Sequence, residues 1–169
     1  LPDNYATPAY SFPDFCEKRF ELGAGEKDVC LFLPWSMTVA LQELSLDDGS
    51  SLLPLIPSKK LLAFGDSITQ GYDAKYSSQT YANLLADMLD AASVNQGIGG
   101  ETFNPDMLDP DLGFVPDLIL VSYGQNDYTK CTKEEMAANA AEFYRRLRET
   151  YPDAKIFSLL PVWRTDCDK

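Results

Sequence analysis

The stretch that decides the fold is Lys60–Gly71, which reads KLLAFGDSITQG. Four apolar residues, ending at Phe64, follow the lysine, as expected for an apolar strand. A polar, glycine-bearing turn, Gly65–Gly71, comes directly after them. In open parallel sheets, ligands bind at the carboxyl ends of the strands. We therefore predict a parallel strand that ends in a functional turn.

Strands and helices alternate beyond this turn. Thr132 and Glu135 form a capping box, which predicts the start of a helix. Such alternation predicts a parallel sheet with helices on both faces, an α/β/α sandwich. The predicted strands are 93–95, 117–123 and 155–160, and the predicted helices are 79–92 and 132–150. Their apolar faces are predicted to carry Tyr81, Leu84, Leu85, Met88 and Leu89 in the first helix and Met136, Ala140, Phe143, Tyr144 and Leu147 in the second.

The region before this domain has a different pattern. Short apolar and alternating runs within residues 17–46 predict antiparallel strands. Pro54 and Pro57 resemble a linker. We therefore predict a small β-rich module over residues 1–57 and an α/β domain over residues 58–169, with Trp35 in the core of the module.

Composition excludes several classes of function. The net charge is −12 and no basic patch is visible, so nucleic acid and anionic membranes are not expected partners. No apolar run approaches the roughly 18 residues that a membrane span needs. The chain contains no histidine and no C-x-x-C pair, so no metal site is expected. Its four cysteines are expected to be buried free thiols, although the sequence leaves a Cys16–Cys30 bridge open.

The cellular compartment is only weakly indicated. The sequence begins at Leu1, so it was either processed or cut from a longer chain. An acidic chain with few cysteines and no visible export signal is expected in the cytoplasm, and secretion stays open.

Three polar turns are predicted to meet at one edge of the sheet: 65–71, 95–100 and 124–127. Acyl transfer requires a nucleophile, donors for the oxyanion and a base. Ser67 offers a hydroxyl, and Gly100 offers an N–H that no side chain shields. A phosphate site is the alternative for glycine turns, but the P-loop pattern is lacking and the carboxylate of Asp66 would repel phosphate.

These turns, in this order, resemble the SGNH (GDSL-like) hydrolase family. G-D-S-I-T-Q-G matches its nucleophile block, N-x-G-x-x-G its glycine block and G-x-N-D its asparagine block, and the resemblance runs from about Lys60 to Arg164. It implies a flavodoxin-like three-layer α/β/α sandwich, with Ser67 as nucleophile and Gly100 and Asn126 as oxyanion donors. It also implies an esterase or acylhydrolase that needs no metal or organic cofactor.

Further residues are expected around the substrate. Asp66 and Asp127 belong to the matched blocks. They are expected to brace the loops that hold the substrate. Tyr72, Phe103 and Trp163 follow predicted strand ends. Each of these aromatic residues is expected to line a substrate pocket or to pack.

The chain departs from the family pattern in one respect. The family's D-x-x-H block supplies a histidine base and an aspartate, yet histidine is absent here. We expect that block in a C-terminal segment beyond Lys169 that completes the fold, and the given chain to be nearly inactive alone. The arrangement of a β module before such a domain resembles carbohydrate esterases that remove acetyl groups from polysaccharides. It indicates a sugar acetyl ester as the substrate. The alternative is a carbohydrate-binding protein on an inactive hydrolase scaffold.

Overall fold

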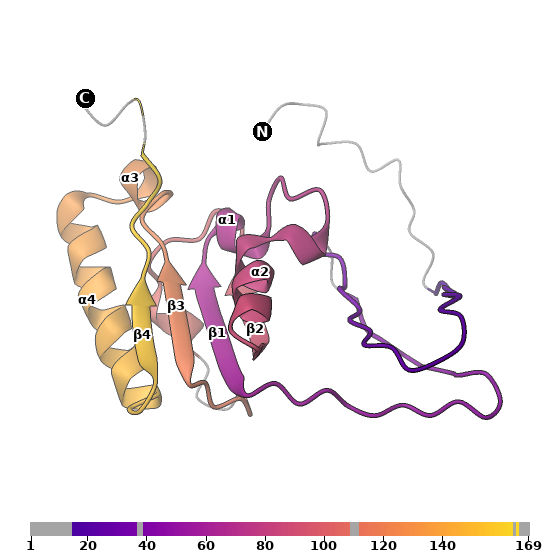
Figure 1. Cartoon of the computed structure of the whole chain (residues 1–169). Coiled ribbons are helices and arrows are strands. Elements are labelled where there is room, and N and C mark those ends of the chain that lie inside the picture. Colours follow the sequence, from indigo (N-terminus) through magenta and orange to yellow (C-terminus); the bar gives the residue numbers. More distant parts are fainter. Residues whose placement is uncertain (1–14, 37–38, 109–111, 164, 166–169) are drawn as a thin grey trace. The chain divides into compact units, whose positions relative to one another are not determined.

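The strand predicted before the first turn is β1 (Lys59–Gly65), and the structure places it inside a parallel sheet. In the computed structural model, which describes residues 15–36, 39–108, 112–163 and 165, the sheet has the order β2-β1-β3-β4 (Figure 1). Every neighbouring pair runs parallel. The other strands are β2 (Ala91–Gly97), β3 (Leu118–Ser122) and β4 (Lys155–Ser158), so each predicted strand of the α/β domain is confirmed.

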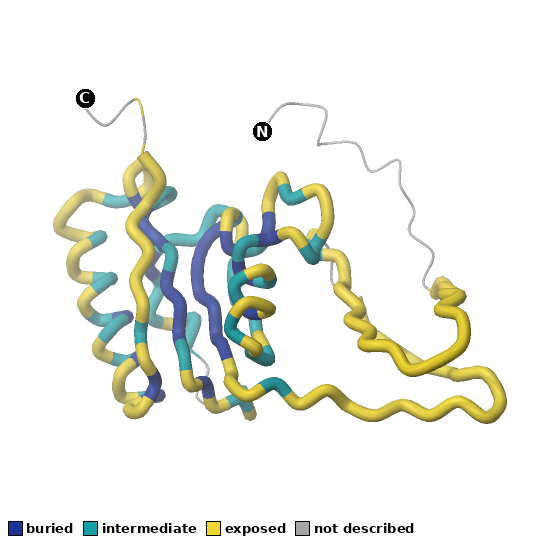
Figure 2. Tube along the Cα trace, viewed as in Figure 1, coloured by how far each residue is buried: buried dark blue, intermediate teal, exposed yellow. Residues whose placement is uncertain are grey.

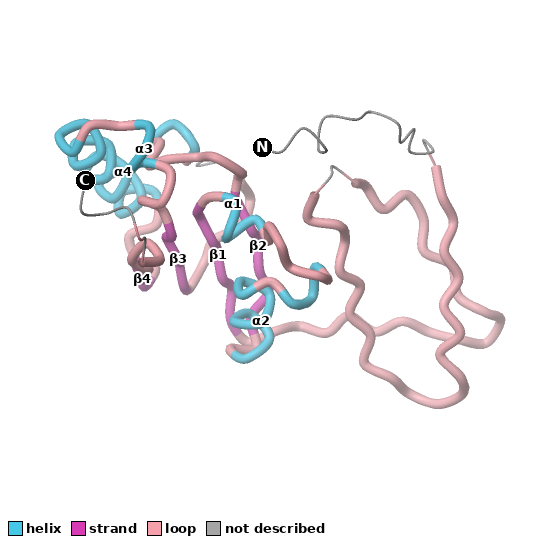
Figure 3. Tube along the Cα trace, turned by 90° about the horizontal axis from the view of Figure 1, so that it is seen from above, coloured by secondary structure: helices cyan, strands magenta, loops and turns pink. Residues whose placement is uncertain are grey.

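Alternate residues of the two central strands face two separate cores. Leu62 of β1 and Ile119 of β3 pack with Phe143 and Leu147 of α4 (Lys133–Thr150). Leu61, Ala63 and Leu120 face the opposite way and pack with Ala82 and Ala86 of α2 (Tyr81–Met88). Seen from above, α4 and α2 lie on opposite faces of the sheet (Figure 3). The expected flavodoxin-like layering, with both faces of the central strands covered, is confirmed.

Local signals explain where the helices begin. Thr132 caps α4 through the predicted capping box, because its hydroxyl accepts from the N–H of Glu135 while the Glu135 carboxylate accepts from the N–H of Thr132. Thr80 caps α2 in the same way, by accepting from the N–H of Asn83. The short helices are α1 (Ser67–Gln70), α3 (Asp127–Lys130) and the 3-10 turns η2 (Ser77–Gln79) and η3 (Pro105–Met107).

The predicted face of α4 is confirmed, but the face of α2 is only partly right. Leu84 and Met88 are exposed, Met88 by 83 % of its surface. The buried positions are Ala82 and Ala86, which let the helix approach the sheet closely. The prediction rested on the spacing of the large apolar side chains and left out the alanines between them.

The predicted antiparallel strands before the α/β domain are wrong for the described residues. None of residues 15–36 and 39–57 is in a strand, and large apolar side chains there, such as Leu41 and Leu55, are exposed. A strand needs partners on its edges and a face to bury, and a lone hairpin is marginally stable at best. By its contacts the chain divides into two units, Leu1–Cys30 and Leu31–Lys169. The predicted boundary at Pro57 stays a prediction.

Two further expectations from the sequence concern the cysteines and membrane-spanning helices. Cys16 and Cys30 are free and exposed, so neither the expected burial nor the bridge is found for them. Cys167 lies outside the described residues. Among the helices of the described residues, none combines the length and the apolar character that crossing a membrane requires.

The sheet is unevenly covered. Buried residues concentrate in β1 and β3, whereas most of β4 is exposed (Figure 2). Phe157 of β4 pairs with Leu120 of β3, yet it keeps 53 % of its surface exposed. Among the described residues, nothing pairs with the outer edge of β4.

Candidate active site

Ser67 stands at the first position of a one-turn helix that follows β1 directly. The carboxylate of Asp66 accepts from the N–H of Ile68 at 2.9 Å and so caps this helix. The carbonyl of Ser67 accepts from the N–H groups of Gly71 and Tyr72 at 3.0 and 2.8 Å. These bonds close a tight turn that holds Ser67 at the carboxyl end of the strand.

The glycine turn after β2 packs against the back of this helix. Asn95 joins the two, because its side-chain amide donates to the carbonyl of Thr69 at 2.7 Å and its oxygen accepts from the N–H of Gly97 at 2.9 Å. A methyl group added at Gly97 would come within 2.3 Å of the Gln70 nitrogen. Only glycine fits there without moving backbone.

The turn then brings Gly99 near Ser67, and Gly100 follows Gly99 in the same turn. The N–H of Glu101 donates to the carbonyl of Ile98 at 3.1 Å, and Gly100 has a φ of +80°. This is the left-handed conformation that favours glycine at the third position of such a turn. A methyl group at Gly99 would lie 3.9 Å from the Cβ of Ser67, which is van der Waals contact. The predicted glycine block therefore reaches the predicted nucleophile.

Asn126 and Lys130 join the same turn from the end of β3. One amide hydrogen of Asn126 is donated to the carbonyl of Glu101 at 3.0 Å, which leaves the amide a second hydrogen to donate. The ammonium of Lys130 donates to the carbonyl of Gly100. Sequence reasoning missed Lys130, since it lies outside the three blocks.

Asp127 holds the asparagine turn and the segment after the glycine turn together. Its carboxylate is 99 % buried and accepts from the N–H of Phe103 and the N–H of Gly124, both at 3.0 Å. Asp66 is also buried, and this desolvation raises its pKa above the ordinary value, helped by the negative charge of Asp127 and opposed by the N–H of Ile68. Both carboxylates accept from backbone N–H groups and so brace the turns.

The three aromatic residues predicted near the substrate have different environments. Phe103 is only 7 % exposed and packs among the rings of Tyr123, Phe143 and Tyr144, which agrees with the packing alternative. Trp163 is 83 % exposed. Tyr72 is half-exposed and meets Trp35 edge to face, with ring centroids 6.1 Å apart.

Trp35 differs from its sequence expectation. It was expected in the core of an N-terminal module, yet its ring is only partly buried and lies against the turn that ends α1. Its carbonyl accepts from the side-chain amide of Gln70 at 3.4 Å. Nothing in its own segment predicted this contact, because the partners are more than thirty residues away in the chain.

A cavity of about 170 Å³ opens on the other side of the nucleophile turn. It lies between Asp66 and Ile68 on one side and the segment that continues β4 on the other. Among the described residues, no group of three or more His, Cys, Asp or Glu side chains could hold a metal ion. The segment after β4 contributes an apolar part of the cavity's lining, formed by Leu159, Leu160, Pro161 and Val162.

A parallel sheet with polar turns gathered at its carboxyl edge is the arrangement of an α/β enzyme. The model of the GDSL-like lipase/acylhydrolase family matches residues 63–169, and the chain belongs to that family. A search of the curated proteins gave no significant match.

Solved structures of hydrolases have the same fold. A family two carbohydrate esterase from Clostridium thermocellum, in complex with cellohexaose, is 20 % identical with a TM-score of 0.58, over 70 % of this chain and 48 % of its own. The family two carbohydrate esterase from Cellvibrio japonicus is 23 % identical with a TM-score of 0.57, over 67 % and 45 %. A carbohydrate esterase family 2 enzyme from Myceliophthora fergusii is 19 % identical with a TM-score of 0.55, over 65 % and 47 %. The chain thus spans about half the length of these relatives.

Proposed function

We propose that this chain carries the nucleophile half of a serine esterase that cleaves acetyl esters of carbohydrates. The observation that carries the proposal is the meeting of three turns near one serine. A Cβ added at Gly99 would lie 3.9 Å from the Cβ of Ser67, and the Asn126 side chain donates to the carbonyl of Glu101, the residue after Gly100. The carbohydrate substrate is proposed from the similar solved structures, which are carbohydrate esterases.

The proposed reaction follows from these positions. The Oγ of Ser67 attacks the ester carbonyl carbon while a base accepts the hydroxyl proton. The carbonyl oxygen becomes an oxyanion, which the N–H groups of Ser67 and Gly100 and the second amide hydrogen of Asn126 stabilise. The C–O bond to the sugar breaks, and the sugar oxygen takes the proton from the base. Water then attacks the acyl-enzyme, releases acetate and restores Ser67.

The base is proposed to come from a D-x-x-H block in a further segment. The chain has no histidine, and without a base Ser67 stays a protonated, weak nucleophile. The open edge of β4 and the exposed Phe157 offer a place where such a segment would pair and pack. The cavity beside Asp66 and Ile68 lies between the nucleophile turn and the segment that continues β4.

The test compares two forms of the protein: the 169-residue chain, and the gene product extended to include a D-x-x-H block. Acetate release from acetylated oligosaccharides is measured for both. We expect near-background release from the short chain and hydrolysis by the long one. Ser67→Ala should lower turnover of the long form by a factor on the order of 10⁶. Ser93→Ala, at an exposed position of β2, is the matched control and should leave turnover unchanged.

Two results would contradict different parts of the proposal. Hydrolysis by pure short chain that Ser67→Ala abolishes would show that the base lies within the 169 residues. A long form that neither hydrolyses esters nor reacts with a fluorophosphonate probe would remove the esterase proposal. It would favour the second candidate, a carbohydrate-binding protein on an inactive scaffold, which the absence of histidine supports.

A further inference from the structure

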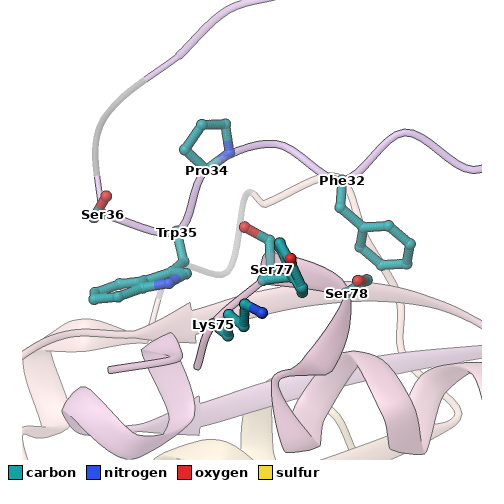
Figure 4. Close-up of a pocket in the computed structure, with 8 residues that line it drawn as sticks. Phe32, Pro34, Trp35, Ser36, Lys75, Ser77 and Ser78 are labelled. Carbon is teal, nitrogen blue, oxygen red and sulfur yellow. The ribbon is translucent and has the colours of Figure 1, made fainter. Parts of the chain in front are cut away.

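A second, larger cavity lies beside the candidate active site, wholly within the unit Leu31–Lys169. It measures about 460 Å³, within the usual range of small-molecule sites. Phe32 and Trp35 approach it from one segment, and Lys75, Ser77 and Ser78 face them from another (Figure 4). We call it the Trp35 pocket.

The Trp35 pocket is coupled to the nucleophile turn through the contacts of Trp35. The ring of Trp35 lies 3.3 Å from where a Cβ of Gly71 would be, and Gly71 caps the helix that begins with Ser67. Gln70 connects the two regions, because its side-chain nitrogen bonds the carbonyl of Trp35 and its side-chain oxygen lies 3.1 Å from where a Cβ of Gly99 would be. The wall of the pocket therefore contacts the turn that holds Ser67.

The lining combines flat apolar faces with small polar groups. Phe32 and Tyr76 keep 39 % and 55 % of their surfaces exposed, so their rings are available to a ligand. The ammonium of Lys75 lies 5.0 Å from the centre of the Tyr76 ring, a cation–π distance that keeps this donor at the pocket wall. The hydroxyls of Ser77 and Ser78 can both donate and accept hydrogen bonds.

This combination fits a sugar ring better than a fatty acyl chain. A pyranose presents C–H faces that pack on aromatic rings, and its edge carries hydroxyls that need donors and acceptors. An aliphatic chain would leave the Lys75 ammonium and the serine hydroxyls without partners, which costs binding energy. We propose that the Trp35 pocket binds a glycosyl unit of a neutral oligosaccharide substrate, next to the unit whose ester reaches Ser67. This inference rests on the proposed function, whose substrate class it narrows.

The test uses fluorescence, because the chain has two tryptophans and one of them can be removed. Trp163 is almost fully exposed, so Trp163→Phe leaves Trp35 as the single reporter in the 169-residue chain. Cellohexaose, xylohexaose and mannohexaose are titrated in turn. We expect at least one of them to change the Trp35 emission saturably, and dodecanoate at equal concentration to leave it unchanged.

Calorimetry on variants then locates the binding. Trp35→Ala and Tyr76→Ala should each weaken oligosaccharide binding at least tenfold, and Trp35→Phe should keep it within about threefold. Met88→Ala, at an exposed position of α2 outside the pocket, should leave binding unchanged. If none of the sugars binds, or if Trp35→Ala and Tyr76→Ala bind as the parent does, the inference is overturned.

The two proposals can fail separately. Ser67→Ala should bind the oligosaccharide as tightly as the parent chain, because the serine is not part of the Trp35 pocket. Sugar binding that depends on Trp35, in a protein without any Ser67-dependent hydrolysis, would remove the esterase and keep the pocket. Ser67-dependent hydrolysis without Trp35-dependent sugar binding would keep the esterase proposal and remove the pocket proposal.

Discussion

At the scale of single residues, two buried carboxylates hold the candidate active site through backbone N–H groups. Asp127 joins the segments after β2 and β3, and Asp66 caps the helix that carries Ser67. A lost acceptor would leave a buried N–H unsatisfied, which costs about 1–3 kcal/mol per group. Because the carboxylates position the donors, their replacement should disturb the turns without removing any reacting atom.

The raised pKa of Asp66 leads to a prediction about how the free energy of unfolding depends on pH. Burial favours the neutral acid in the folded state, so this residue's stabilising contribution is full below its unfolded pKa and is lost as pH rises through the folded pKa. Asp66→Asn removes the charge but keeps an oxygen for the N–H of Ile68. The free energy of unfolding of this variant, relative to the parent, should therefore be higher at pH 7 than at pH 4, as measured by urea denaturation.

A matched control accounts for the loss of one negative charge. Asp87→Asn changes an exposed position of α2 and should show a smaller dependence on pH than Asp66→Asn. If Asp66→Asn gains nothing between pH 4 and pH 7, then burial does not raise the pKa of Asp66, and the bond from Ile68 dominates instead.

At the scale of elements, α4 carries the main core of the sheet. Phe143 is fully buried and meets the rings of Phe64, Phe103, Tyr123 and Tyr144, with centroids 5.5 to 6.0 Å apart. Phe143→Ala should lower the free energy of unfolding by about 3–5 kcal/mol, because it removes a large buried ring and leaves a cavity.

Met88→Ala is the control for this prediction, and it should change stability by less than about 0.5 kcal/mol because Met88 is exposed on α2. Phe143→Leu should fall between the two and keeps the test readable if the alanine variant fails to fold. Equal losses for Phe143→Ala and Met88→Ala would contradict the core assignment. Urea denaturation measures all three.

The sequence predicted those elements whose signals are local. The apolar run that ends at Phe64 predicted β1, and the pair Thr132 and Glu135 predicted the start of α4. The turn residues Ser67, Gly100 and Asn126 were found because they follow strands, and they do gather at one edge. Their catalytic roles stay a prediction.

The features that could not be predicted from the sequence depend on contacts with residues far away in the chain. Phe103 was expected to line a pocket or to pack, and its place in the core is decided by α4, some forty residues later. Trp35 contacts α1 through tertiary packing that no periodicity encodes. The runs within residues 17–46 have strand-like composition, but a strand also requires a neighbour, which composition does not supply.

At the scale of the whole molecule, the uncovered side of the sheet makes a prediction about association. Phe157 and Leu160 are exposed at or just beyond β4, whose outer edge has no partner among the described residues. Exposed apolar edges favour pairing with another chain, and lysines on such edges prevent it. We expect the 169-residue chain to self-associate as its concentration rises, and the double variant Phe157→Lys, Leu160→Lys to associate at least tenfold more weakly.

Sedimentation velocity measures this association over a concentration series. Val115→Lys, at an exposed position in the loop before β3, controls for the added charge and should associate like the parent. A parent chain that stays monomeric at every concentration would show that the edge of β4 is protected.

The order of the strands also has a consequence for how the protein folds. β1 comes first in the chain but lies between β2 and β3, and every pairing is parallel, so each joins segments separated by a crossover. Such distant pairings are slow to form, because the entropy of closing the loops is lost before the contacts are gained. Helices such as α4 depend on local bonds and can form early. The candidate active site needs the ends of three strands side by side, and it is therefore expected to be among the last parts of the chain to assemble.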